Sequence, residues 1–191
     1  SFSRSPYLQS NINSIPLVCP DIANRAILYE RYRFNGGYKM AKALVVYATI
    51  TGNNEDVADI ITDALENLGV EVDEVEMTMA DPADFEEADI CVICPYTYDE
   101  GALPEEGIDF YEDLQEEQLA GKVYGVAGSG DTFYGDDFCV AVDKFGDALA
   151  KTGATKGAEN VKINLAPDEE DIQKLDAFAK QLVEKAAKLN D

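Results

Sequence analysis

The sequence predicts a three-layer α/β domain in which a mainly parallel, doubly wound sheet is covered by helices on both faces. From residue 40 onward, strand-like apolar runs alternate with amphipathic segments of helical period. The central runs, residues 90–94 and 123–127, are almost continuously apolar, which is typical of strands buried on both faces. Ligands of such sheets bind beyond the carboxyl ends of the strands, so the loops at those ends are the candidates for function.

Five strands and four helices are predicted. The strands are expected at residues 43–47, 70–75, 90–94, 123–127 and 161–165. The helices are expected near residues 54–68, 107–118, 138–152 and 167–189. Connections between parallel strands are nearly always right-handed, which gives the helices their places on the two faces.

Charge divides the chain into two unlike parts. Of the formal net charge of −23, residues 1–39 contribute +3, from five basic and two acidic side chains, and residues 40–191 contribute −26. A domain this acidic is repelled by nucleic acid and anionic lipid and is steered toward proteins with basic faces. We therefore expect protein partners, and neither nucleic-acid nor membrane binding.

Residues 1–39 are expected to form an atypical N-terminal leader or extension outside the core, with residues 40–191 as the domain. The leader is rich in Ser, Asn, Arg and Tyr, and Met40 stands just before the first predicted strand. Its apolar run at residues 15–18 is too short for a secretory signal and contains Pro16. Its composition weakly matches an organellar transit peptide, and a translated upstream leader or an artificial extension is the alternative. We expect poor packing there and assign no function.

The turn after the first predicted strand has the composition of an anion site. Residues 49–54, Thr-Ile-Thr-Gly-Asn-Asn, offer two hydroxyls, two carboxamides and a glycine directly before a predicted helix. The N-terminus of a helix attracts anions through its free N–H groups and its dipole. The turn contains no Lys or Arg, unlike the phosphate loops of nucleotide-hydrolysing proteins. It therefore predicts the anchoring of a cofactor by a terminal phosphate.

Aromatic residues stand in two further loops at the same edge of the predicted sheet. Tyr96 and Tyr98 follow the third strand, and Phe133 and Tyr134 follow the fourth. A large ring left in water forgoes about 1.5–3 kcal/mol of burial, which stacking on a flat ligand would recover. The alternative is that these rings pack on neighbouring side chains. Two such loops beside an anion site favour a planar ligand.

Catalysis by side chains and metal binding have little support. The chain has no histidine, the commonest general base and metal ligand. Cys91 and Cys94 have C-x-x-C spacing but fall within a predicted strand, where they face opposite sides, so we expect core packing instead of a redox pair. Acidic runs such as residues 168–171 are interpreted as solvated surface. Four cysteines without a disulfide framework indicate a reducing cytoplasm.

Two other classes share the predicted architecture and lack their motifs here. A phosphoacceptor receiver domain needs acids after the first strand and an aspartate after the third, where this chain has Tyr-Ala-Thr at residues 47–49 and Cys-Pro-Tyr at residues 94–96. A nicotinamide-binding Rossmann domain has the pattern G-x-G-x-x-G after its first strand, and this pattern is missing.

Three motifs together resemble the FMN-binding loops of short-chain bacterial flavodoxins. They are residues 49–54, residues 96–101, and residues 128–132 with Tyr134 and residues 138–143, in this order. The resemblance covers essentially residues 40–191. It implies a five-stranded sheet of order 2-1-3-4-5, one non-covalent FMN, and the shuttling of single electrons between a reductase and acceptor enzymes. A flavodoxin-like activator dedicated to one enzyme is the alternative, and we expect a monomer.

The resemblance assigns the cofactor contacts residue by residue. The phosphate is expected at Thr49, Ile50, Thr51, Gly52, Asn53 and Asn54. The inner and outer faces of the flavin ring are expected against Tyr98 and Tyr134, respectively. Backbone groups of Thr97, Asp99, Glu100, Gly130, Asp131 and Cys139 are expected at the pyrimidine edge and N5, and Tyr96 and Ser129 complete the set.

Three departures from the family pattern carry expectations of their own. Asn54 stands where the family usually has Thr or Ser, and its carboxamide can also donate. One extra residue lies between Tyr134 and Cys139. Asp99 stands where glycine is frequent, and a side chain resists the positive φ that glycine allows, which predicts a smaller separation of the two one-electron potentials. The surplus of acids predicts a strongly reducing lower potential, because anions disfavour the second electron.

Overall fold

The sheet of the computed structural model confirms the predicted strand order. The structure describes residues 33–34, 37–38, 40–97, 103 and 105–189. Across the parallel sheet the strands run β4, β3, β5, β6, and both β7 and β8 pair with β6 beyond that. Their bounds are β3 Lys42–Tyr47, β4 Glu71–Glu76, β5 Ile90–Cys94, β6 Val123–Gly130, β7 Thr155–Lys156 and β8 Val161–Asn164. With β7 and β8 taken as one interrupted strand, the order is 2-1-3-4-5.

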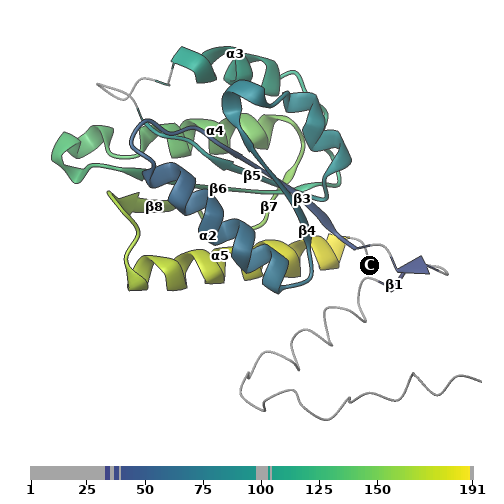
Figure 1. Cartoon of the computed structure of the whole chain (residues 1–191). Helices are drawn as coiled ribbons and strands as arrows, with labels where there is room; N and C mark the ends of the chain where they lie inside the picture. Colours follow the sequence, from purple (N-terminus) through teal and green to yellow (C-terminus); the bar gives the residue numbers. More distant parts are fainter. Residues whose placement is uncertain (1–32, 35–36, 39, 98–102, 104, 190–191) are drawn as a thin grey trace, which may run out of the picture.

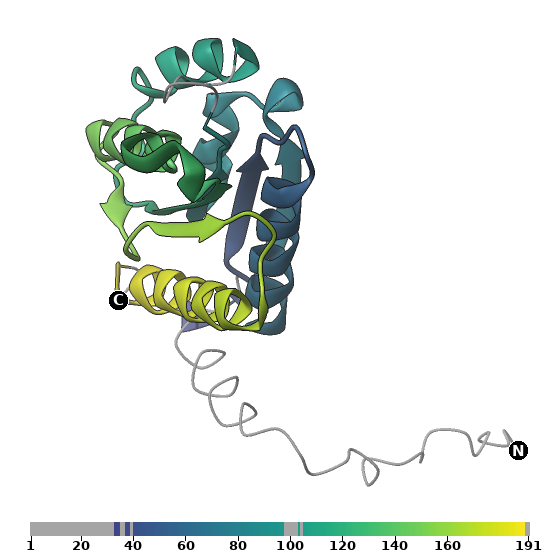
Figure 2. The same cartoon turned by 90° about the vertical axis from the view of Figure 1, so that its left-hand side faces the viewer.

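Two pairs of helices cover the sheet. One pair, α2 (Asn53–Asn67) and α5 (Glu169–Leu189), lies on one face, and the other pair, α3 (Glu105–Leu114) and α4 (Val140–Lys151), lies on the opposite face (Figure 1). Figure 2, turned by 90°, shows the same two pairs on either side of the strands. Short 3-10 helices are formed by Met77–Met79, Pro82–Glu87 and Thr132–Asp137. The three predicted layers are therefore present.

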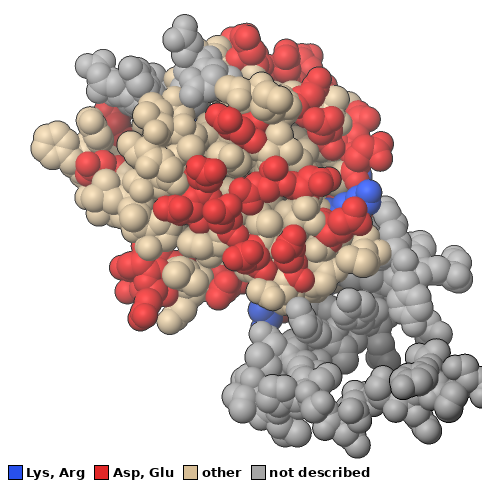
Figure 3. All heavy atoms as spheres, in the orientation of Figure 1, with Lys and Arg blue, Asp and Glu red and all other residues tan. Residues whose placement is uncertain are grey.

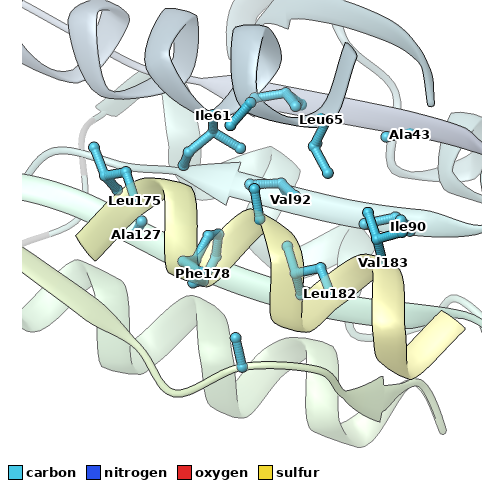
Figure 4. Close-up of a cluster of buried hydrophobic side chains, with 14 of the residues drawn as sticks. Ala43, Ile61, Leu65, Ile90, Val92, Ala127, Leu175, Phe178, Leu182 and Val183 are labelled. Carbon is cyan, nitrogen blue, oxygen red and sulfur yellow. The ribbon is translucent and has the colours of Figure 1, made fainter. Parts of the chain in front are cut away.

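Apolar side chains of α2 and α5 meet over the centre of the sheet. Ile61 of α2 and Phe178 and Leu182 of α5 pack against Val92 of β5, and all four are fully buried or nearly so (Figure 4). Each such side chain contributes about 1.5–3 kcal/mol on burial. At Gly125 in β6 an ideal Cβ would lie 2.6 Å from Phe178 Cζ, so α5 sits this close only because β6 presents a glycine.

The two cysteines of the C-x-x-C sequence point to opposite faces of the sheet, as predicted. Cys91 packs in the apolar cluster beneath α3 and α4, and Cys94 packs in the cluster beneath α2 and α5. Both thiols are free and buried. Burial raises the pKa of the Cys91 thiol to about 12, so it stays protonated at neutral pH. The prediction of core packing is confirmed.

The fifth strand is interrupted, which the apolar pattern of residues 161–165 does not show. β7 pairs with the first half of β6 and β8 pairs with its second half, while residues 157–160 leave the ladder between them. At Gly157 an ideal Cβ would lie 2.3 Å from Val123 Cγ1, so only a glycine lets the chain pass this closely. Because the ladder resumes beside the end of β6, β8 delivers Asn164 to the carboxyl edge of the sheet.

Helix α4 begins at Val140, two residues later than predicted. Residues 132–137 before it form a 3-10 segment that is kinked at Gly135, where φ is 55°. Asp131 caps this segment by accepting a hydrogen bond from Phe133 N at 2.8 Å. Cys139 then takes a left-handed conformation with φ of 52°, which separates the two helices. The chain between β6 and α4 is thus a compact turn with its own structure.

Part of the expected leader is described, and it forms a small antiparallel pair. β1 (Arg33–Phe34) pairs with β2 (Gly37–Tyr38), where no strand is predicted. Residues 1–32 lie outside the described residues, so the poor packing expected of the leader stays a prediction. None of the helices in the described part of the chain combines the length and apolar character that a membrane span requires.

Candidate functional site

A cavity of about 600 Å³ lies where the carboxyl ends of the strands meet. In Figure 1 this end is at the left, where α2 begins, the turn after β6 projects and the chain leaves β8. The volume falls within the range of about 300–1,000 Å³ that is usual for small-molecule and cofactor sites. The lining residues are Ile50, Thr51, Asn53, Asn54, Tyr96, Thr97, Ser129, Gly130, Asp131, Tyr134, Asp137, Cys139 and Leu165.

The turn that leads into α2 presents an uncapped helix N-terminus to the cavity. Gly52 is the N-cap residue, with φ of 92°, and no side chain caps the helix there. Thr49 Oγ1 accepts a hydrogen bond from Gly52 N at 2.9 Å, which closes the turn. The first helical bond runs from Asp56 N to Gly52 O, so the N–H groups of residues 53–55 precede the helical ladder. Such an end attracts an anion without any cationic side chain.

Asn54, the second residue of α2, is tied to the end of β6 by two hydrogen bonds. Its Oδ1 accepts from Ser129 N at 2.7 Å, and its Nδ2 donates to Ser129 O at 3.2 Å. The residue is only 4% exposed, so both bonds are shielded from water. Gly128 leaves room beside Asn54, since an ideal Cβ there would lie 3.3 Å from Asn54 Oδ1 and only 2.6 Å from Pro95 O. The carboxamide that was expected to donate to a phosphate is thus engaged with the protein through its oxygen and one N–H.

Gly130 and Cys139 approach each other across the turn after β6. An ideal Cβ on Gly130 would lie 2.8 Å from Cys139 Sγ, which leaves no room for a side chain. The single S–H of Cys139 has two carbonyl oxygens within weak hydrogen-bond distance of its sulfur, Gly128 O at 3.6 Å and Ile163 O at 3.8 Å. Burial raises the pKa of this thiol to about 11, so it remains protonated at neutral pH. The side chain of Cys139 packs in the apolar cluster beneath α4. Its backbone N lies beside Gly130, 3.3 Å from the position of an ideal Cβ there.

The loop after β5 is anchored to α4. Thr97 Oγ1 accepts a hydrogen bond from Ala141 N at 3.1 Å, so this hydroxyl caps the second residue of the helix. Tyr96, beside it, is buried and lines the cavity. Tyr98, Asp99 and Glu100 lie outside the described residues, and the contacts expected of them stay predictions.

Two aromatic rings of the 3-10 helix stand largely in solvent. Tyr134 is 53% exposed and Phe133 is 86% exposed, and the rings pack edge to face with centroids 5.6 Å apart. Packing against a neighbouring side chain, the alternative considered above, accounts for one contact and leaves most of both rings uncovered. Only Tyr134 of the two lines the cavity.

Every predicted site residue in the described part of the chain lines the cavity except Thr49 and Gly52, which shape the turn beneath it. Asp137 and Leu165 line it without having been predicted as cofactor contacts. Asp137 belongs to an acidic pair beside the aromatic loop. Leu165 is the last residue of the fifth predicted strand, so its place at the carboxyl edge was the signal that could have identified it.

Comparison with known proteins settles the family. The flavodoxin family model matches residues 45–178. The chain belongs to the flavodoxin family. Probable flavodoxin 1 of Bacillus subtilis (strain 168) is 41% identical over 142 residues, which cover 74% of this chain and 89% of that protein.

Solved flavodoxin structures share the fold over the same part of the chain. A short-chain flavodoxin associated with a PDU bacterial microcompartment is 62% identical, with a TM-score of 0.76, and the match covers 77% of this chain and 99% of that one. The flavodoxin of Streptococcus pneumoniae TIGR4 is 53% identical, with a TM-score of 0.74, and the match covers 76% of this chain and 99% of that one.

Flavodoxins bind FMN and transfer electrons, and the cavity fits this cofactor. Its volume accommodates a cofactor, its floor offers an uncapped helix N-terminus to a phosphate, and its rim offers an exposed aromatic ring to a flat ligand. When bound, FMN supplies the electron chemistry, and the chain supplies binding, orientation and electrostatics. No group of three or more Cys, Asp or Glu side chains suited to a metal ion occurs among the described residues.

Replacing Asn54 by Ala is expected to destabilise the FMN-free protein by about 2–3 kcal/mol, because the buried N–H and C=O of Ser129 lose their partners. Asn53→Ala is the matched control one residue away, and its free energy of unfolding should stay within about 0.5 kcal/mol of the parent. Urea unfolding followed by circular dichroism measures both values. Equal stability of the two variants would contradict the role assigned to Asn54.

Proposed function

We propose that this flavodoxin carries single electrons at low potential between a reductase and acceptor enzymes whose docking faces are basic, and that it works as a cytoplasmic monomer. The observation that carries the proposal is the charge of the cavity. Among its described lining residues, Asp131 and Asp137 are acidic and none is basic. A carrier of this kind needs no catalytic side chain, because the cofactor performs the redox chemistry and the protein tunes it.

The residues that hold FMN are proposed from their places around the cavity. The N-terminus of α2, with Thr51 and Asn53, receives the phosphate. Both residues line the cavity, so the hydroxyl of Thr51 and the free N–H groups of the helix end can bind the anion there without a cation. Tyr134 covers the outer face of the ring, and Tyr98, by resemblance, covers the inner face. The turn at Gly130 brings backbone close to the cavity because it has no side chain.

An apolar rim surrounds the cavity mouth and gives a partner its contact surface. Its members are Ile50, Phe133, Tyr134 and Leu165, which are 64%, 86%, 53% and 47% exposed. Acidic side chains spread over the adjoining face of the molecule, over α2 (Figure 3). An apolar centre within an acidic surround supports fast, transient docking of a basic partner. The same charge argues against nucleic acid and anionic membranes as partners.

Acidic side chains also favour a low potential for the second electron. A unit charge about 10 Å from the flavin contributes on the order of 0.4 kcal/mol in a water-like dielectric. For a one-electron couple this is roughly 18 mV per carboxylate. Several carboxylates together with the phosphate reach on the order of 100 mV, and salt reduces the part that comes from exposed groups.

Asp137→Asn is expected to raise the lower one-electron potential by about 10–20 mV at low ionic strength and by less in high salt, since it removes one anion from the cavity wall. Asp63→Asn on α2 is the control, because residue 63 lies about 15 Å along the helix from its cavity end. Potentiometric titrations of both variants at two ionic strengths measure the shifts. A lower potential that changes neither with Asp137→Asn nor with ionic strength would rule out the electrostatic explanation.

The carrier role is tested with partners. A general NADPH-linked flavodoxin reductase from the same organism should reduce the FMN-loaded protein within seconds, and the reduced protein should pass electrons to more than one acceptor enzyme. Stopped-flow absorbance of the flavin follows both steps. Rapid transfer to a single acceptor, with none to others, would instead establish a dedicated activator.

A further inference from the structure

A fourth segment of the chain closes the cavity, in addition to the three loops that contain the predicted contacts. It is the end of β8 with the residue that follows, Asn164 and Leu165. Leu165 lines the cavity and is 47% exposed. It reaches this place because the interruption of the fifth strand lets β8 pair with the last residues of β6.

Three hydrogen bonds join this segment to the turn after β6. Leu165 N donates to Gly130 O at 2.7 Å, and the hydroxyl of Ser129 donates to Leu165 O. Thr132 N donates to Asn164 Oδ1 at 3.0 Å. The residues from Ser129 to Thr132 are therefore held from the β8 side, while Asn54 holds Ser129 from the α2 side.

An unusual backbone conformation also occurs at Leu165, where the segment meets the cavity. In the described part of the chain, Cys139 and Leu165 are the two non-glycine residues with positive φ, at 52° and 59°. Both line the cavity. A left-handed conformation is disfavoured for a leucine, so it persists only where surrounding bonds enforce it, and such residues concentrate at functional sites. At Leu165 the enforcing bonds are those of its own N–H and C=O to Gly130 and Ser129.

We propose that Asn164 and Leu165 are positioning residues of the FMN site. They fix the turn from Ser129 to Thr132 in its binding conformation before the cofactor arrives, so less conformational freedom is lost on binding. The proposal rests on FMN binding at this cavity. Asn164 acts on FMN through Thr132, and Leu165 acts through Gly130 and Ser129. The side-chain oxygen of Asn164 is the atom that can be removed without disturbing the strand backbone.

Asn164→Ala tests this role. Loss of the bond to Thr132 N is expected to weaken FMN binding about five- to tenfold, measured by quenching of FMN fluorescence on titration of the apoprotein. The exposed position predicts that the melting temperature of the apoprotein changes by less than about 2 °C. Asn164→Asp keeps the accepting oxygen at an exposed site, so at 0.15 M salt it should bind FMN within about twofold of the parent.

Asn160→Ala is the matched control in the same β7–β8 connection. Its Nδ2 donates to Asp143 Oδ1 at 3.2 Å, away from the turn after β6, so its FMN affinity should equal that of the parent. The proposal is overturned if Asn164→Ala binds FMN as tightly as the parent, if Asn164→Asp is as weak as Asn164→Ala, or if the apoprotein melting temperature falls in step with affinity. Failure of the electron-carrier role in the reductase assay would leave these binding results standing, so the two outcomes are distinguishable.

Discussion

The pair of hydrogen bonds between Asn54 and the backbone of Ser129 is the contact on which the rest of the site depends. It joins the first turn of α2 to the end of β6 in a buried place, where both bonds are shielded from water. Without it, α2 would still pack on the sheet and β8 would still hold the turn that follows β6, but no side-chain hydrogen bond would join the first turn of the helix to the end of β6. With it, these two walls of the cavity are tied together by one buried side chain.

This link explains how the site binds a phosphorylated cofactor without a cation. In the proposed binding mode, N–H groups at the uncapped end of α2 receive the anion, instead of Lys or Arg. Because no described residue of the cavity lining is basic, Asp131 and Asp137 have no opposite charge beside them in the cavity wall. The proposed low potential and the proposed attraction for basic partners both rest on this arrangement.

The sheet order and most of the residues that line the cavity could be predicted from the sequence. Apolar runs locate the strands, and the carboxyl ends of parallel strands lie at one edge of the sheet. The roles of residues that depend on partners far away in the sequence could not be predicted in this way. The sequence predicts Asn54 as a donor to the anion, because nothing in the local sequence shows that its carboxamide is hydrogen-bonded to the backbone of Ser129, 75 residues away. Leu165 stands at the carboxyl end of a predicted strand, but its role at the cavity depends on hydrogen bonds to Gly130 and to Ser129, 36 residues away, which no local pattern shows.

Amide hydrogen exchange at Ser129 in the FMN-free protein tests this account most directly. If Asn54 Oδ1 holds Ser129 N–H before the cofactor binds, that amide should exchange at least about 100-fold more slowly than an unprotected amide, and Asn54→Ala should abolish most of the protection. An amide that exchanges at the unprotected rate in the apoprotein, and becomes protected only when FMN is added, would contradict a site assembled by the chain itself.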